Sequence, residues 1–309
     1  MMNLDEISFT PPQWLLIYYF SAGFVSVLIS TFCVYLILFR SVKIGNFKYF
    51  LLWFNISCAV TDVSMTILLR PVALLPIWAL YSVGYAWKLL GIPFRETTLF
   101  FVFWVGEQFA ALVCCFLYKH QTISQLGSKL ILSKSVFTSA VVSFQFAISA
   151  FVVFFFYVQN DQETALRIAH QIYPSLAYEF DSLQSFQLFA ENKNYPLFLA
   201  FCVFAGTIVV LAVGGLTWHM IHILNGNRRK MSGTNFQRHK NAVNSLVAQP
   251  IYSQEISYLM CAVFSSHSTI NCLILIATSP AYRRIFTKRK PSSNSSPSVF
   301  MKVASMSHG

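Results

Sequence analysis

Few side chains in the sequence could do chemistry, and the most unusual are two acids inside apolar runs, Asp62 and Glu107. An acid at the centre of a membrane helix costs about 2.5–3.5 kcal/mol, so it normally faces neighbouring helices or a wet cavity. For Glu107 two interpretations stay open: a ligand or ion role, and a protonated side chain bonded to a neighbouring helix. For Asp62 we expect a structural bond to a Ser or Asn of a neighbouring helix.

Histidine and amide side chains supply the other candidates. His267 and Asn271 lie four residues apart, on one helical face that should point inward. They complete, with Asp62 and Glu107, the set of ligand-pocket or buried polar candidates. His219 and His222 could present two imidazoles to a metal, but no carboxylate or Cys joins them nearby. We therefore interpret those two as interfacial polar residues and predict no metal and no cofactor.

The composition is that of an integral membrane protein. Hydrophobic residues make up 56% of the 309 residues and charged residues only 11%, against about 25% in soluble domains. The net charge of +11 therefore describes loops and tail, where a basic excess marks cytoplasmic loops beside anionic lipid. Nucleic-acid binding would need a basic soluble face with aromatic residues among it, and none is visible. No HEXXH or G-x-S-x-G motif is present, so we expect no enzyme.

Long apolar runs predict helices that position these side chains. About twenty residues at 1.5 Å each cross the roughly 30 Å of bilayer hydrocarbon. We expect residues 71–87 to extend the second span and then form an interfacial outer loop, with Trp78, Tyr81, Tyr85 and Trp87 at the lipid headgroups. The predicted spans cover residues 14–39, 49–69, 97–118, 135–158, 196–224 and 255–279.

The charges of the loops predict the orientation. Basic residues follow the first span, so we expect the N-terminus outside and a multi-pass protein of the plasma membrane. The loop 159–195, with five acids and two bases, should also lie outside. The loop after residue 224 and the tail 280–309 carry dense basic residues and should be cytoplasmic. Beyond Pro291 the tail is rich in Ser, so we predict no fold there.

The sixth span is short. The basic loop that ends at Lys240 and the tail that begins at Pro280 are both expected inside, so the chain between them must cross the membrane an even number of times. Residues 242–251 offer about ten weakly apolar residues, half a membrane thickness. We therefore predict one transmembrane bundle over residues 1–279, with a stump in place of helix six.

A series of short motifs accompanies the predicted spans along the chain. Pro71 and Pro76 precede Gly91-Ile92-Pro93, the third span ends in residues 115–121 (CFLYKHQ), and His267 precedes Pro280-Ala281-Tyr282-Arg283. In this order the features resemble the seven-helix chemosensory receptors of nematodes, in the Str superfamily, closest to its Sri and Srh classes. The resemblance covers roughly residues 49–286. It implies an all-α integral membrane protein, a seven-transmembrane-helix receptor-like bundle with helix six truncated to a stump.

The resemblance also implies a function. The outer ends of the helices would hold a small-molecule ligand, and the inner end would contact a heterotrimeric G protein, with sensory cilia as one location. Helix six moves outward when seven-helix receptors are activated, so a stump leaves a non-signalling member as one alternative. A six-span transporter or channel is the other, although it would predict internal repeats that we do not see. The residues expected to face the G protein are Lys119, His120, Arg228, Arg229, Lys230, Arg283 and Arg284.

Overall fold

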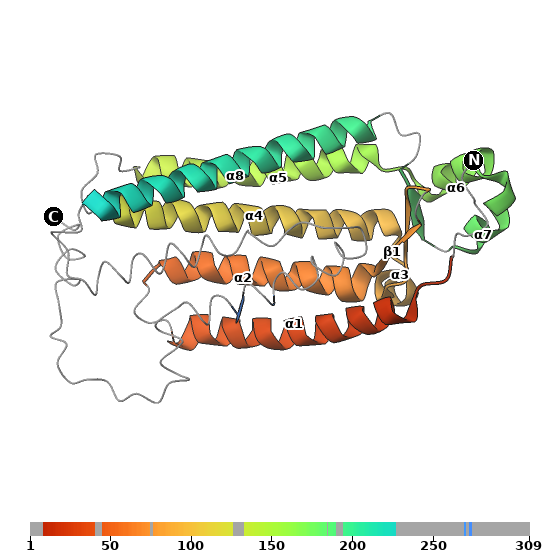
Figure 1. Cartoon of the computed structure of the whole chain (residues 1–309), viewed down its shortest axis with the longest axis horizontal. Helices are drawn as coiled ribbons and strands as arrows, with labels where there is room; N and C mark the ends of the chain where they lie inside the picture. Colours follow the sequence, from red (N-terminus) through yellow and green to blue (C-terminus); the bar gives the residue numbers. More distant parts are fainter. Residues whose placement is uncertain are drawn as a thin grey trace.

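Five long helices make up most of the computed structural model, and each is long and apolar enough to cross a membrane. Consecutive long helices run in opposite directions (Figure 1). They are α1 (Gln13–Arg40), α2 (Phe47–Val63, continued by a π-helical turn to Leu69), α4 (Phe94–Ser124), α5 (Lys134–Val158) and α8 (Tyr195–Gly226). The structure describes residues 9–40, 45–74, 77–125, 133–183, 185–189, 194–226, 269 and 272–273.

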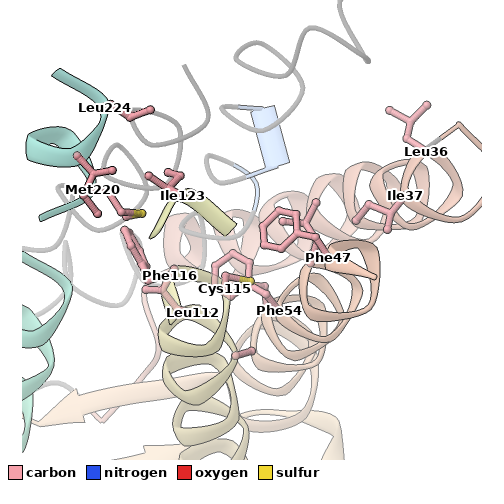
Figure 2. Packing of buried hydrophobic residues seen from close by; sticks show 14 residues of the cluster. Leu36, Ile37, Phe47, Phe54, Leu112, Cys115, Phe116, Ile123, Met220 and Leu224 are labelled. Atoms are coloured by element: carbon pink, nitrogen blue, oxygen red, sulfur yellow. The ribbon is translucent and has the colours of Figure 1, made fainter. Parts of the chain in front are cut away.

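These helices occupy the first five apolar runs and extend each by a few residues. The predicted stump at 242–251 lies outside the described residues, as does the last span at 255–279 except for Thr269, Cys272 and Leu273. Helix α4 is central, because it packs against α2, α5 and α8. Large side chains from α1, α2, α4 and α8 form the main core near one end of the bundle (Figure 2), among them Ile37, Phe47, Phe54, Phe116, Ile123 and Met220.

The second span ends in a π-helical turn, Ser64–Leu69, and not in an extension beyond it. Arg70 adopts the left-handed conformation, with φ of 44°, and its N–H donates to Met65 O at 3.0 Å. Pro71 follows, and a proline disfavours helical geometry in the residue before it. The Arg70 guanidinium lies over the ring of Tyr85, 4.6 Å from its centroid. The helix therefore stops at this turn, contrary to the expectation of an extended span.

The segment after it forms a small antiparallel sheet, which the sequence interpretation missed. Its strands are β1 (Pro71–Leu74), β2 (Ala79–Ser82) and β3 (Phe186–Leu188), in the order β1-β2-β3. A short helix, α3 (Tyr85–Leu90), follows β2. Tyr81 was expected at the lipid headgroups, but it is buried and its hydroxyl donates to Phe9 O at 2.8 Å. Trp78 and Tyr85 are exposed, as that expectation requires.

The sheet belongs to a compact cap at one end of the bundle (Figure 1). We use "cap" for residues 71–82 together with 162–188, which include α6 (Gln162–Ile172), the 3-10 turn Pro174–Leu176 and α7 (Ala177–Ser182). Its own core joins side chains of both segments to the start of α1. Tyr19 of α1 is fully buried there and donates to Pro71 O at 2.8 Å. The cap is therefore packed onto the bundle.

Gly84 allows the chain to pass very close to the end of the second span. Its N–H donates to Leu69 O at 3.2 Å, and a Cβ at this position would overlap the carbonyl of Leu68. That carbonyl is backbone and cannot rotate away. Only glycine fits where the sheet joins the bundle.

Candidate functional site

Asp62 is buried between α1 and α2 and is 2% exposed. The hydroxyl of Ser26, on α1, donates to its Oδ2. Its backbone carbonyl accepts from the Thr66 hydroxyl at 2.6 Å, close to the start of the π-helical turn. The carboxylate thus makes the kind of contact expected of a structural acid, a bond to a serine of a neighbouring helix.

Asn55 lies two turns before Asp62 on α2, and sequence reasoning missed it. Its Nδ2 donates to Cys272 Sγ at 3.2 Å, and Cys33 Sγ of α1 donates to Cys272 O at 3.9 Å. The spacing in the sequence could have indicated Asn55, because it lies seven residues before Asp62 and residues seven apart share one helical face. These contacts tie Cys272 to α1 and α2. His267 and Asn271 lie outside the described residues.

Glu107 lies among three helices and is 6% exposed. Its Oε2 accepts from Trp53 Nε1 of α2 at 3.1 Å and from Gln145 Nε2 of α5 at 3.3 Å. The neighbouring Gly106 brings α5 close, since a Cβ there would lie 2.9 Å from Ile148 Cγ2. The other carboxylate oxygen, Oε1, is buried without a hydrogen-bond partner among the described residues.

An aromatic hollow borders Glu107, and we call it the α2–α4 groove. Its volume is about 510 Å³. Trp104, on the same helix, also lines it, and its indole Nε1 has no hydrogen-bond partner in the part of the chain that the structure describes. Asp62 is not in the groove, so the two acids belong to two separate places. The groove is lined by Tyr49, Leu52, Trp53 and Ile56 of α2 and by Phe103, Trp104 and Glu107 of α4.

The end of the bundle opposite the cap holds two of the residues expected to face a G protein. Lys119 Nζ lies over the Phe47 ring, 4.1 Å from its centroid. His120 is 7% exposed, and its Nε2 lies 2.7 Å from Nδ1 of His219 on α8, with the two rings stacked. His120 therefore points at α8 and not at the surface. Arg228, Arg229, Lys230, Arg283 and Arg284 lie outside the described residues.

His219 contacts His120 of α4 and not His222, its neighbour in the sequence. His222 lies beside the Trp218 ring, with centroids 6.3 Å apart, while His219 turns to another helix. Within the described ranges, no group of three or more His, Cys, Asp and Glu side chains could hold a metal ion. The sequence interpretation paired His219 with His222, its neighbour in the chain, whereas the contact partner of His219 is 99 residues away.

Two acidic residues contact the helices of the cap: Asp161, which directly precedes it, and Asp181 within it. Asp161 precedes α6, and its Oδ2 accepts from the Thr164 N–H at 3.3 Å. Hydrogen bonds from the side chain and backbone of Thr164 lower the pKa of Asp161 below its usual value. His170 Nε2 lies 2.9 Å from Asp181 Oδ1 and links α6 to α7 at the surface.

Comparison with known protein families decides the class of the bundle. Residues 5–253 and 250–286 match the serpentine type seven-transmembrane GPCR chemoreceptor family Sri. The chain belongs to the Sri family. The predicted family and the predicted class of fold, a helical membrane bundle of the seven-transmembrane receptor type, are therefore confirmed. No curated protein matches the chain.

Membership of the Sri family allows the described helices to be compared with the number of spans expected for the family. The five long helices account for five of the seven spans that the family description specifies. Sri is a class of receptors and not of enzymes. The chain is thus a chemoreceptor-like, multi-pass membrane protein.

Proposed function

We propose that this Sri protein is a chemosensory receptor that binds a small molecule and couples to a heterotrimeric G protein. The family match, which extends from residue 5 to residue 286, is the observation that supports it. The side-chain chemistry agrees, because the bundle contains buried hydrogen-bonding groups such as Asp62 and Glu107 within mostly apolar walls. Sites for small molecules are typically apolar with a few placed polar groups.

The orientation in this proposal follows the charges. The cap, with its acidic residues, lies outside, and the opposite end, with Lys119 and the basic segments at 228–230 and 283–284, is cytoplasmic. The protein would be a multi-pass component of the plasma membrane, with sensory cilia as a location that the family suggests. The G protein would then meet the inner ends of α2, α4 and α8.

A polar contact joins the inner ends of α4 and α8. The His120 and His219 rings stack with centroids 4.9 Å apart. His120 would affect coupling by holding α8 in position, whereas Lys119 is only half-buried and could also contact a partner. Coupling would therefore require both residues for different reasons.

Helix six decides whether the receptor signals. The family match is divided into two segments that overlap at residues 250–253, at the end of the predicted stump 242–251. This supports a shortened helix six. A receptor that binds its ligand and does not signal is the second form of the proposal.

A cell assay with separate readouts for binding and signalling tests the proposal. Cells that express the full chain and a reporter of G protein activation are exposed to a panel of small molecules. We expect a concentration-dependent response to at least one compound. Lys119→Ala and His120→Ala should abolish it at unchanged surface level, while Lys88→Ala, at the cap end, should leave it intact.

Each other outcome has a distinct meaning. An unchanged response in the Lys119 and His120 variants would reject their role in coupling. Binding without any response would favour the non-signalling form. Neither binding nor response from protein at the cell surface would contradict the proposal.

A further inference from the structure

We propose that His120 of α4 and His219 of α8 form a proton-sensitive switch. The contact joins the two helices while both rings are neutral, and it opens when the pair takes up a proton. His120 Nε2 lies 2.7 Å from His219 Nδ1. The switch is a property of the helix bundle and needs no partner protein, whereas its effect on signalling rests on the coupling proposed above.

The surroundings of the two rings determine which nitrogen atoms carry hydrogen. A neutral histidine has one N–H group and one acceptor nitrogen. Only one hydrogen fits between His120 Nε2 and His219 Nδ1. His120 Nδ1 is buried and has no hydrogen-bond partner among the described residues, and a buried N–H group without an acceptor is costly. The neutral pair therefore carries its hydrogens on His120 Nε2 and on Nε2 of the half-buried His219.

Proton uptake conflicts with this arrangement. A singly charged pair has three hydrogens on four ring nitrogens, and only one of them lies between the rings while the contact lasts. The other two must then occupy the two outer nitrogens. One of these is His120 Nδ1, for which the described part of the chain offers no acceptor. A doubly charged pair would place two hydrogens in the 2.7 Å gap. Separation of the rings relieves both conflicts.

The neighbouring charges also disfavour a charged pair. Helix α4 packs against α2, α5 and α8. Glu107, the nearest acid of α4, lies thirteen residues before His120, about 20 Å along the helix. Within the described ranges, the charged side chains at this end of the packed helices are cations: Lys48 of α2, Lys119 of α4 and Lys134 of α5. The other titratable side chains in this part of α4 and α8 are Cys115, Tyr118 and His222.

Acidification should therefore separate the inner ends of α4 and α8. An unperturbed histidine titrates near pH 6.5, so a fall from pH 7.5 to pH 5.5 favours the open state about tenfold for each ring that opening releases. The contact is fully formed above this range and is lost as the pH falls through it. Because coupling is proposed to need α8 in its position, acid in the cytoplasm would weaken the response.

Distance measurements on the purified full chain in lipid nanodiscs test the switch. Spin labels are attached to unnatural amino acids at Gln125 and Asn225, which are exposed near the ends of α4 and α8. We expect the ratio of the longer to the shorter distance population to rise about ten- to hundredfold from pH 7.5 to pH 5.5. Nitrogen NMR of the histidine rings at pH 7.5 should show hydrogen on His120 Nε2 and none on His120 Nδ1.

Matched variants separate the shared hydrogen from packing. His120→Gln and His219→Asn each place an amide near the contacting nitrogen of the lost ring. An amide can donate or accept, so the contact tolerates a proton on the remaining histidine, and the distance should not depend on pH. His222→Gln removes an exposed histidine of the same helix and should leave the pH dependence unchanged.

Three results would overturn the proposal. They are equal distances at both pH values in the unmodified chain, hydrogen on His120 Nδ1 at pH 7.5, and an unchanged pH effect in both matched variants. If those variants do not fold, the unmodified chain and the His222 variant decide the question. None of these measurements uses a ligand or a G protein, so failure of the switch and failure of the receptor proposal are distinguishable.

Discussion

At the scale of single residues, the two buried acids differ in what surrounds them. Ser26 of α1 donates to Asp62, while Glu107 holds Trp53 and Gln145 on one oxygen and leaves the other unpaired. The sequence could place both acids inside apolar spans. It could not supply their partners, because these lie on other helices and the rotation of each helix is set by packing.

The Ser26 contact predicts a loss of stability on substitution. Ser26→Ala would leave a buried carboxylate oxygen without this donor, which costs about 1–3 kcal/mol. Ser21→Ala, on the exposed side of α1, should change stability by less than about 0.5 kcal/mol. Thermal unfolding of the purified chain in detergent measures both. Equal unfolding temperatures for the two variants would mean that Ser26 does not stabilise Asp62.

Asp161 predicts a local effect in the cap. Asp161→Ala removes the N-cap of α6 and should destabilise that helix by about 0.5–2 kcal/mol, whereas Asp161→Asn keeps a capping oxygen and should cost little. Hydrogen exchange of the α6 amides measures the difference. Indistinguishable exchange in the Ala variant and the unmodified chain would contradict the capping role.

The same residue predicts a pH dependence. Because its pKa is lowered in the folded protein, its contribution is fully present above the unfolded value of roughly 3.9 and is lost as the pH falls through the folded value. The protection factors of the α6 amides, which are their exchange rates corrected for the intrinsic dependence on pH, should therefore fall below about pH 4 in the unmodified chain. The Asn variant should lack this component, and an identical pH profile in both would show that Asp161 is not its source.

At the scale of elements, the long helices could be predicted and the cap could not. Apolar run length is enough to identify a span, and α1, α2, α4, α5 and α8 follow it closely. The strands of the cap are only three or four residues long, and β3 follows β2 by about a hundred residues. Nothing local in residues 71–87 indicates that pairing. The apolar character of β1 and β2 instead suggested a lipid interface.

Substitution of Gly84 tests the close approach of the chain where the cap joins the bundle. Gly84→Ala would drive a Cβ into the Leu68 carbonyl, and such overpacking costs about 1–3 kcal/mol or more. Gly206→Ala, on α8 with no atom near its added Cβ, should be neutral or stabilising. Limited proteolysis of the cap and thermal unfolding measure the contrast. A Gly84 variant as resistant as the Gly206 variant would show that the close approach is not required.

At the scale of the whole molecule, contacts between distant segments organise both ends of the bundle. His120 meets His219 at one end, and Tyr19 meets Pro71 beneath the cap at the other. The sequence could indicate the membrane class, the family and the candidate charged residues. It could not indicate that His120 is buried against α8, because both histidines lie near helix ends where polar residues are common.

A seven-helix receptor with its N-terminus outside has a cytoplasmic tail, and the chain contains its own reporter of where the tail lies. Asn294-Ser295-Ser296 is an acceptor for N-glycosylation that only a lumenal tail could use. The other acceptor sequence, Asn55-Ile56-Ser57, lies within α2. As a positive control, Leu183→Asn creates an acceptor sequence in the cap, which we propose lies outside.

The decisive measurement is the mass shift of the chain expressed in cells, before and after glycosidase treatment. We expect no shift for the unmodified chain and a glycosidase-sensitive shift for the Leu183→Asn variant. A shift of the unmodified chain that is removed by glycosidase and lost in Asn294→Gln would put the tail outside and contradict the seven-helix account.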